Sequence, residues 1–164
     1  NQSGRKISLP YGVEALRCYG GVKLQKKTEE ILERTEEAQV LNMEGDTIWE
    51  NETFRTCIFP YSGEKILEKK YTKWLDCDKI NCELSVRTRR SGDYMIVNQS
   101  GGSKKLTRCM IDDKIPGEIR QEIPLVAAKD EVLWIVGGRI SERYKITSQT
   151  EKVLEITYQG GSIE

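Results

Sequence analysis

Short runs of β-branched and aromatic residues, separated by Gly, Pro and Asp turns, recur along most of the chain. Such runs predict β-strands, because these side chains suit a pleated, half-buried surface. A hairpin is expected over residues 11–27, where glycines at 20 and 21 supply a tight turn. The further expected strands cover residues 38–43, 47–49, 54–59, 71–75, 84–88, 94–97, 125–127, 132–136, 143–146 and 153–158.

Helical spacing is confined to two short segments. Ser103 is a candidate cap for a helix in which Leu106, Cys109 and Met110 face inward. A second short helix is expected from Pro116 to near Ile123. We therefore predict an α+β, mostly β fold: a small β-sheet or β-sandwich-like domain with two short helices on one side.

The chain of 164 residues suits one domain, or one compact domain with a small attached subdomain. We expect a boundary between an N-terminal β-hairpin and strand subdomain, 1–70, and a C-terminal domain, 71–164. Residues 28–37 could form a helix or an exposed linker, and residues 76–80 a turn or a single helical turn. No apolar run reaches the length of a membrane span, so no membrane partner is expected.

The formal net charge of zero hides a strong asymmetry. Residues 28–52 hold nine acidic side chains and one basic one, Arg34, so the rest of the chain is basic on balance. Such asymmetry says more about partners than the total charge does. A basic face, and therefore an anionic partner, is compatible with this composition.

Catalytic and metal-binding chemistry is poorly represented. The chain has no histidine, which removes Ser-His and Cys-His nucleophilic pairs and the usual general base near neutral pH. Its five cysteines include no Cys-x-x-Cys pair, so a zinc site is not expected. We expect reduced thiols that are mostly buried instead. The default place for the three tryptophans is also the core.

Basic residues concentrate between residues 86 and 124, where eight of them meet five acidic ones. Period-two alternation along the strand at 84–88 places Arg87 and Arg89 on one polar face, with Arg90 at the strand end. Each arginine could instead form a surface ion pair, for instance Arg90 with Asp93. The cluster as a whole favours an anion-binding face, with a nucleic-acid backbone as the anion.

The loop Ser100-Gly-Gly-Ser103 resembles the phosphate loop of ATP pyrophosphatases, which holds pyrophosphate on glycine amides. Here Lys104 and Lys105 stand where that loop has Asp and Ser, and no βαβ pattern surrounds it. ATP binding is therefore disfavoured. An RNA phosphate and an ordinary helix-capping turn remain as alternatives.

Several segments occur in an order and spacing that together resemble one known family. They are YTKWLDCDKI (71–80), RTRRSGD (87–93), GGSKKL (101–106), IDDKIP (111–116), IPL (123–125), LWIVGGRIS (133–141) and YKIT (144–147). The series resembles the C-terminal portion of bacterial tRNA(Ile)-lysidine synthetase, most strongly from residue 71 to 147. Ser91 and Gly117 depart from the Pro and Arg that are common in this family at those positions.

The resemblance implies a parent enzyme that is an ATP-dependent ligase of the bacterial cytoplasm. Such an enzyme uses ATP, with Mg, to adenylate the wobble cytidine of isoleucine tRNA, and then attaches lysine to form lysidine. Its ATP loop lies in an N-terminal catalytic domain, which would be a partner of this chain. The C-terminal portion binds the tRNA body, including the acceptor stem. We therefore expect this chain by itself to be inactive, with no catalytic residue, cofactor or metal site.

We accordingly predict a tRNA-binding domain that contacts phosphate or ribose groups and reads A-form shape more than base sequence. The candidate RNA-binding residues are Arg87, Arg89, Arg90, Lys104, Lys105, Arg108, Lys114 and Arg120. The alternative is a protein–protein docking module that uses its strands and Trp134 and has no affinity for nucleic acid.

Overall fold

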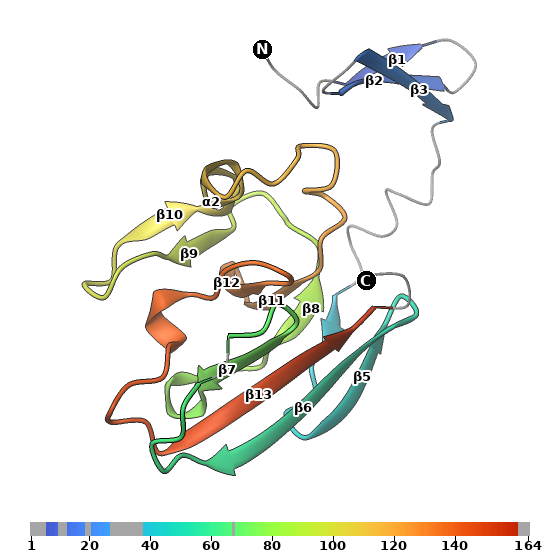
Figure 1. Cartoon of the computed structure of the whole chain (residues 1–164). Coiled ribbons are helices and arrows are strands. Elements are labelled where there is room, and N and C mark those ends of the chain that lie inside the picture. The colour runs from blue at the N-terminus through green and yellow to red at the C-terminus, as the bar shows by residue number, and fades with distance from the viewer. Residues whose placement is uncertain (1–5, 10–12, 19–20, 27–37, 67, 161–164) are drawn as a thin grey trace.

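The computed structural model describes residues 6–9, 13–18, 21–26, 38–66 and 68–160, the first three ranges by their backbone alone. The described strands form a three-stranded, a six-stranded and a four-stranded sheet (Figure 1). The expected mostly β, α+β class is confirmed. Within the described residues, no helix combines the length and the apolar character that crossing a membrane requires.

The three-stranded sheet consists of β1 (Lys6–Leu9), β2 (Val13–Cys18) and β3 (Gly21–Lys26). Strands β2 and β3 pair antiparallel with Cys18 opposite Gly21, which confirms the expected hairpin, and β1 adds a third strand beside β2. The expected helix or linker at 28–37 lies outside the described residues.

The four-stranded sheet has the order β5-β6-β13-β7. Its strands are β5 (Gly45–Trp49), β6 (Glu52–Pro60), β13 (Lys152–Gln159) and β7 (Thr72–Asp76). The last strand in sequence lies at the centre and pairs antiparallel with both β6 and β7. Its residues Leu154, Ile156 and Tyr158 are buried at a spacing of two, so one face of this sheet forms the core.

The six-stranded sheet has the order β10-β9-β12-β11-β8-β4. Its strands are β10 (Ser103–Lys105), β9 (Tyr94–Ile96), β12 (Glu131–Ile135), β11 (Leu125–Ala128), β8 (Ser85–Arg87) and β4 (Gln39–Val40). Only β9 and β12 pair in parallel; the other pairs are antiparallel. Every residue of β11 and β12 is buried, because both faces of this part of the sheet are covered.

Two cores lie on the two faces of the six-stranded sheet. On one face Val86, Val126 and Trp134 belong to a cluster that includes Phe54, Leu154 and other residues of the four-stranded sheet. On the other face Leu125, Val132 and Ile135 cluster with the buried side of helix α2 (Leu106–Asp112). Figure 1 shows this arrangement, with the four-stranded sheet and α2 at opposite ends of the body. Trp134 is completely buried, so it cannot serve the docking surface that the alternative prediction gave it.

The start of α2 differs from the prediction. Ser103 is not a helix cap but the first residue of β10, where it pairs with Ile96, and the helix begins at Leu106. The loop before it is a hairpin turn in which Gly101 has a φ of +89° and the Gly102 amide donates to the Asn98 side chain. Strand pairing therefore overrides the local cap. The predicted inward positions Leu106, Cys109 and Met110 are all buried, as expected.

Two further local predictions are wrong. The segment after Pro116 is a series of turns, with backbone bonds from Ile119 to Pro116 and from Glu122 to Ile119, because Gly117 disfavours a continuous helix there. The expected strand at 143–146 contains a 3₁₀ helix, Glu142–Tyr144, which is capped by the Ser141 side chain. The remaining expected helical turn is present as the 3₁₀ helix Cys77–Lys79.

Replacing Met110 should test the packing of α2. Met110 is fully buried and its neighbour Ile111 is 46% exposed, so the two positions form a matched pair on one helix. We expect Met110→Ala to lower the free energy of unfolding by about 2–5 kcal/mol through the cavity it leaves. Ile111→Ala should change it by only about 0.5 kcal/mol. Urea unfolding followed by circular dichroism gives both values, and equal losses would contradict this docking of the helix.

Candidate nucleic-acid interface

Arg87 is a buried structural residue. It is 1% exposed, and its two terminal nitrogens form a bidentate ion pair with Asp93 at 2.8 Å. The same nitrogens also donate to the backbone carbonyls of Thr88 at 3.0 Å and Lys129 at 2.7 Å. The expected outward polar face is therefore wrong for Arg87, because the Asp93 loop and the β11–β12 turn cover the end of β8. Its guanidinium is not available to an RNA phosphate in this structure.

The Arg87–Asp93 pair shapes the loop that carries the next two arginines. One oxygen of the Asp93 carboxylate also accepts the backbone amide of Arg90 at 2.7 Å, and the Asp93 amide donates to the Arg90 carbonyl at 3.3 Å. Gly92 has a φ of +93°, a conformation that glycine adopts without strain. The resulting turn leaves Arg89 half-buried and Arg90 exposed.

Strand β10 separates the two lysines that follow one another in sequence. Lys104 pairs with Met95 and Lys105 with Tyr94 in the antiparallel ladder, so their side chains point to opposite faces of the strand. Lys105 reaches the side on which Arg89 and Arg90 lie, and Lys104 does not line that side. The fold thus brings three of the predicted residues together from two segments of the chain.

These three side chains surround a cleft of about 690 Å³, which we call the basic cleft. Polar donors also line it: Ser91 from the turn, Thr107 from the first turn of α2 and Gln121 from the segment after Pro116. These three residues carry no signal in the sequence, because they become neighbours only through tertiary structure. The carboxylate of Asp93 lines the cleft as well, but it is already bonded to Arg87.

Positive charge in the basic cleft is not balanced locally. Burial lowers the pKa of the Arg89 guanidinium, and the nearby positive charge of Arg120 lowers it further, against a smaller opposite effect of Asp93. Arg120 is held in place by a bond of 2.8 Å from its Nε to the Ile115 carbonyl. Among the described residues, Arg89 and Lys105 form no salt bridge. Like charges held close together in this way favour an anionic ligand.

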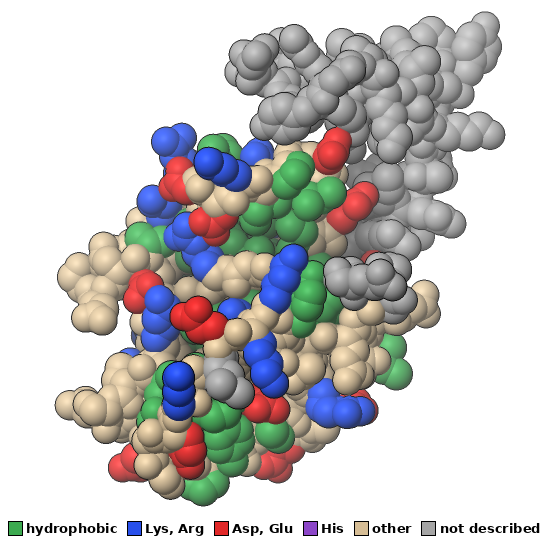
Figure 2. Space-filling model, in the orientation of Figure 1, with side chains coloured by type: hydrophobic (Ala, Val, Ile, Leu, Met, Phe, Trp, Pro, Cys, Tyr) green, Lys and Arg blue, Asp and Glu red, His purple; other side chains and the backbone are tan. Residues whose placement is uncertain are grey.

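The other predicted basic residues lie in different surroundings. Lys104 and Arg108 both approach Asp112, at 3.0 and 3.5 Å, and the hydrogen bond from Lys104 is the main cause of the lowered pKa of that carboxyl. Figure 2 shows Lys and Arg side chains mixed with Asp and Glu over the end of the molecule formed by α2 and β10. Lys114 is exposed after the end of α2 and lines a different cavity.

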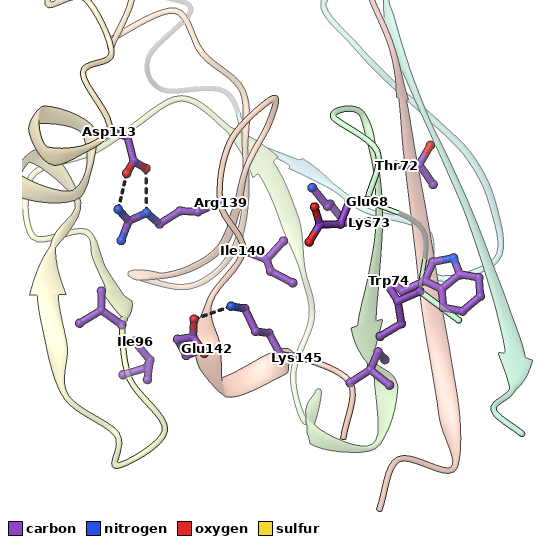
Figure 3. A pocket seen from close by; sticks show the side chains of 13 residues that line it. Glu68, Thr72, Lys73, Trp74, Ile96, Asp113, Arg139, Ile140, Glu142 and Lys145 are labelled. Carbon is purple, nitrogen blue, oxygen red and sulfur yellow. Dashed lines mark hydrogen bonds and ion pairs between the residues drawn. The ribbon is translucent and has the colours of Figure 1, made fainter. Parts of the chain in front are cut away.

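A second cavity, of about 720 Å³, illustrates the contrast with the basic cleft (Figure 3). It lies beside β7 and contains Arg139 and Lys145, each of which points to a carboxylate. Arg139 forms a two-pronged ion pair with Asp113, which raises the pKa of the arginine, and Lys145 pairs with Glu142. Two of its cations, Arg139 and Lys145, are therefore already paired, whereas Arg89 and Lys105 of the basic cleft form no salt bridge with a described residue.

A third cavity, of about 690 Å³, is mainly apolar. Ile115, Ile119 and Ile123 line it together with the Gly137–Gly138 turn. Arg139 and Asp113 line both this cavity and the second cavity beside β7, so their ion pair lies between the two cavities. Within the described residues, no group of three or more Cys, Asp or Glu side chains is arranged to hold a metal ion.

Comparisons with known proteins agree with the fold. Residues 84–156 match the family model of the TilS substrate C-terminal domain. The chain is 39% identical to a tRNA(Ile)-lysidine synthase of Caldanaerobacter subterraneus and 34% identical to one of Clostridium perfringens. These matches cover 93% and 96% of the chain but only 33% and 36% of the relatives, so the chain spans about a third of their length. The crystal structure of a TilS C-terminal domain shares the fold, with a TM-score of 0.61 over 77% of this chain and 100% of that one, at 24% identity.

Replacing Arg87 should show that the site depends on a buried ion pair. Arg87→Met leaves the Asp93 carboxylate buried without its cation, and we expect a loss of about 3–5 kcal/mol in the free energy of unfolding. Arg108→Met removes an arginine whose side chain is 67% exposed, and should cost about 0.5 kcal/mol. Chemical denaturation measures both variants. A stable Arg87→Met protein would mean that the loop does not depend on this pair.

Proposed function

Because the chain belongs to the C-terminal domain family of tRNA(Ile)-lysidine synthases, we propose that it binds tRNA through the basic cleft and the arginines beside it. The observation that carries this proposal is the convergence of Arg89, Arg90 and Lys105 on one cleft, with Arg120 next to Arg89. Elsewhere in the described structure, several cations of the same kind are paired with Asp or Glu. A phosphate backbone would supply a negative charge for Arg89 and Lys105, which form no salt bridge with a described residue.

The chemistry of the cleft suits phosphate and ribose groups. An arginine can bridge two phosphate oxygens with parallel hydrogen bonds, and a lysine adds a mobile point charge. Hydroxyl and amide donors such as Ser91, Thr107 and Gln121 can reach phosphate or 2′-hydroxyl oxygens. Such contacts fix the position of an RNA helix without reading its bases. Base selection would then depend on other parts of the enzyme or on RNA shape.

In this proposal, the catalytic reaction takes place in another part of the enzyme. The parent ligase would use ATP, Mg and lysine to modify the wobble cytidine of isoleucine tRNA, in a catalytic domain that this chain does not include. The chain itself would supply affinity and orientation, in the bacterial cytoplasm. Arg87 supports the loop in this scheme, and Lys104, Arg108 and Lys114 lie outside the basic cleft as secondary contacts.

Salt dependence tests the RNA contacts. Each phosphate contact contributes a slope of about −0.7 to −0.9 to log affinity against log salt, with the single-strand and B-form DNA values as limits. We expect the double variant Arg89→Gln/Lys105→Gln to reduce the magnitude of this slope by roughly 1.5 and to weaken binding to every tRNA similarly. Filter binding or fluorescence anisotropy at several salt concentrations measures the slope.

A matched control removes the same net charge elsewhere. Arg55 and Lys145 are exposed and paired with Asp46 and Glu142, away from the basic cleft. Arg55→Gln/Lys145→Gln should leave the slope nearly unchanged. If both double variants lower the slope equally, the contribution is one of total charge. If wild-type protein binds no tRNA, the docking-module alternative replaces the proposal.

Catalytic inactivity of the chain by itself is a separate expectation. Mixed with ATP, Mg, lysine and isoleucine tRNA, it should release no AMP above background, because the proposed reaction centre lies outside it. Thin-layer chromatography of labelled ATP detects the product. Lysine-dependent AMP release by the chain alone would place an active site within these residues.

A further inference from the structure

We propose that the basic cleft is a pocket for a terminal phosphate monoester of RNA, such as the 5′-phosphate of a tRNA, rather than for a phosphodiester within a strand. This inference rests on the proposed function, because it assigns the cleft one particular group of the RNA. It concerns which phosphate enters the cleft, and RNA binding as such does not require it.

The charge of the cleft favours a monoester. A phosphodiester carries one negative charge, whereas a terminal phosphate monoester carries about −1.5 to −2 at pH 7. The cleft presents Arg89 and Lys105, neither of which forms a salt bridge with a described residue, and Arg120 is close enough to perturb Arg89. Its only carboxylate among the described lining residues, Asp93, is bonded to Arg87. The local excess of positive charge therefore exceeds what a single diester neutralises.

The directions from which donors reach the cleft also favour an end group. A diester within a strand has two free oxygens, while a monoester has three that point away from the chain. Donors reach the cleft from three separate segments of the chain. Arg89 and Ser91 come from the turn after β8, and Lys105 and Thr107 come from the junction of β10 and α2. Gln121 comes from the segment after Pro116. An end group can be surrounded from three sides in this way, because no chain continues beyond it.

The cleft is also rigid and large enough for the end of an RNA strand. The turn at 90–93 is fixed by the buried Arg87–Asp93 pair and by the bond from the Arg90 amide to Asp93, so the donors are preorganised. A volume of about 690 Å³ falls within the usual range of small-molecule sites, roughly 300–1,000 Å³, and leaves room for the terminal nucleotide beside its phosphate. The cleft is thus large enough for the end of a strand.

The test compares two forms of one RNA. An isoleucine tRNA transcript with a 5′-monophosphate and the same transcript after phosphatase treatment are titrated into the 164-residue chain at constant salt. We expect the 5′-phosphorylated form to bind about tenfold more tightly. The dephosphorylated form lacks the charged group, and therefore the hydrogen bonds that this group would make with the cleft. Arg89→Gln and Lys105→Gln should each reduce this ratio toward one. Arg55→Gln, which removes an exposed arginine paired with Asp46 away from the cleft, should leave the ratio unchanged.

A pH series gives a second readout that a structural role would not produce. The second ionisation of a phosphate monoester lies near pH 6, and protonation below it removes one negative charge. The charged groups that line the cleft are Arg89, Arg90, Lys105 and the paired Asp93, Arg120 acts on Arg89 from outside the lining, and the chain contains no histidine. The affinity ratio of the two RNAs should therefore be largest near pH 8 and shrink toward pH 5.

The outcomes separate the two proposals. If neither RNA binds, the proposed function itself fails. If both bind with equal affinity and the Arg89 and Lys105 variants weaken both equally, the cleft holds an internal phosphodiester and the present inference is wrong. Inorganic phosphate provides a last control: at matched ionic strength it should reduce the advantage of the 5′-phosphorylated RNA and leave binding of the dephosphorylated RNA unchanged. Equal competition against both RNAs would also overturn the inference.

Discussion

The buried ion pair between Arg87 and Asp93 is the interaction on which the proposed site depends. It joins the end of β8 to the loop before β9, and through the Lys129 carbonyl it also reaches the turn between β11 and β12. Burial of two charges is unfavourable unless each finds several partners. Here the guanidinium makes four hydrogen bonds and the carboxylate receives the Arg90 amide in addition. Loss of either partner would leave an uncompensated charge in the core.

The position of this pair follows from how the sheets are layered. The six-stranded sheet packs against the four-stranded sheet on one face and against α2 on the other, so β11 and β12 are buried throughout. The basic cleft lies at the edge of the α2 layer, where the turn after β8, the end of β10 and the segment after Pro116 meet. The same packing that buries Leu106 therefore brings its neighbours Lys105 and Thr107 to the cleft.

Charge pairing, more than the number of cations, distinguishes one surface of the molecule from another. Two groups can be distinguished among the described basic residues: some are held by carboxylates, and some face other cations. Lys104, Arg108 and Arg139 belong to the first group, and Arg89 to the second. In the first group, the positive charge is compensated by a neighbouring carboxylate. The second retains electrostatic attraction that a polyanion can use, and such attraction also speeds association.

Local sequence patterns determined much of the secondary structure. Alternation and β-branched content located most strands. The spacing of Leu106, Cys109 and Met110 predicted the buried face of α2 correctly, although the predicted start of the helix was wrong. The order of seven segments identified the family, because their combined spacing is specific even though each one alone is weak. Composition also indicated that the basic stretch at 86–124 would contain the anion-binding residues, which remains a prediction.

Only the tertiary structure decided which of those basic residues share a surface. The sequence places Arg87 and Arg89 in equivalent alternating positions, yet one is buried with Asp93 and the other lines the cleft. Ser103 is of a type that often caps helices, but it lies in β10 because its backbone pairs with Ile96 of β9. Thr107 and Gln121 meet Arg89 only after folding. Alternation reports the direction of a side chain relative to its own strand, whereas its burial and charge partners depend on what packs over that strand.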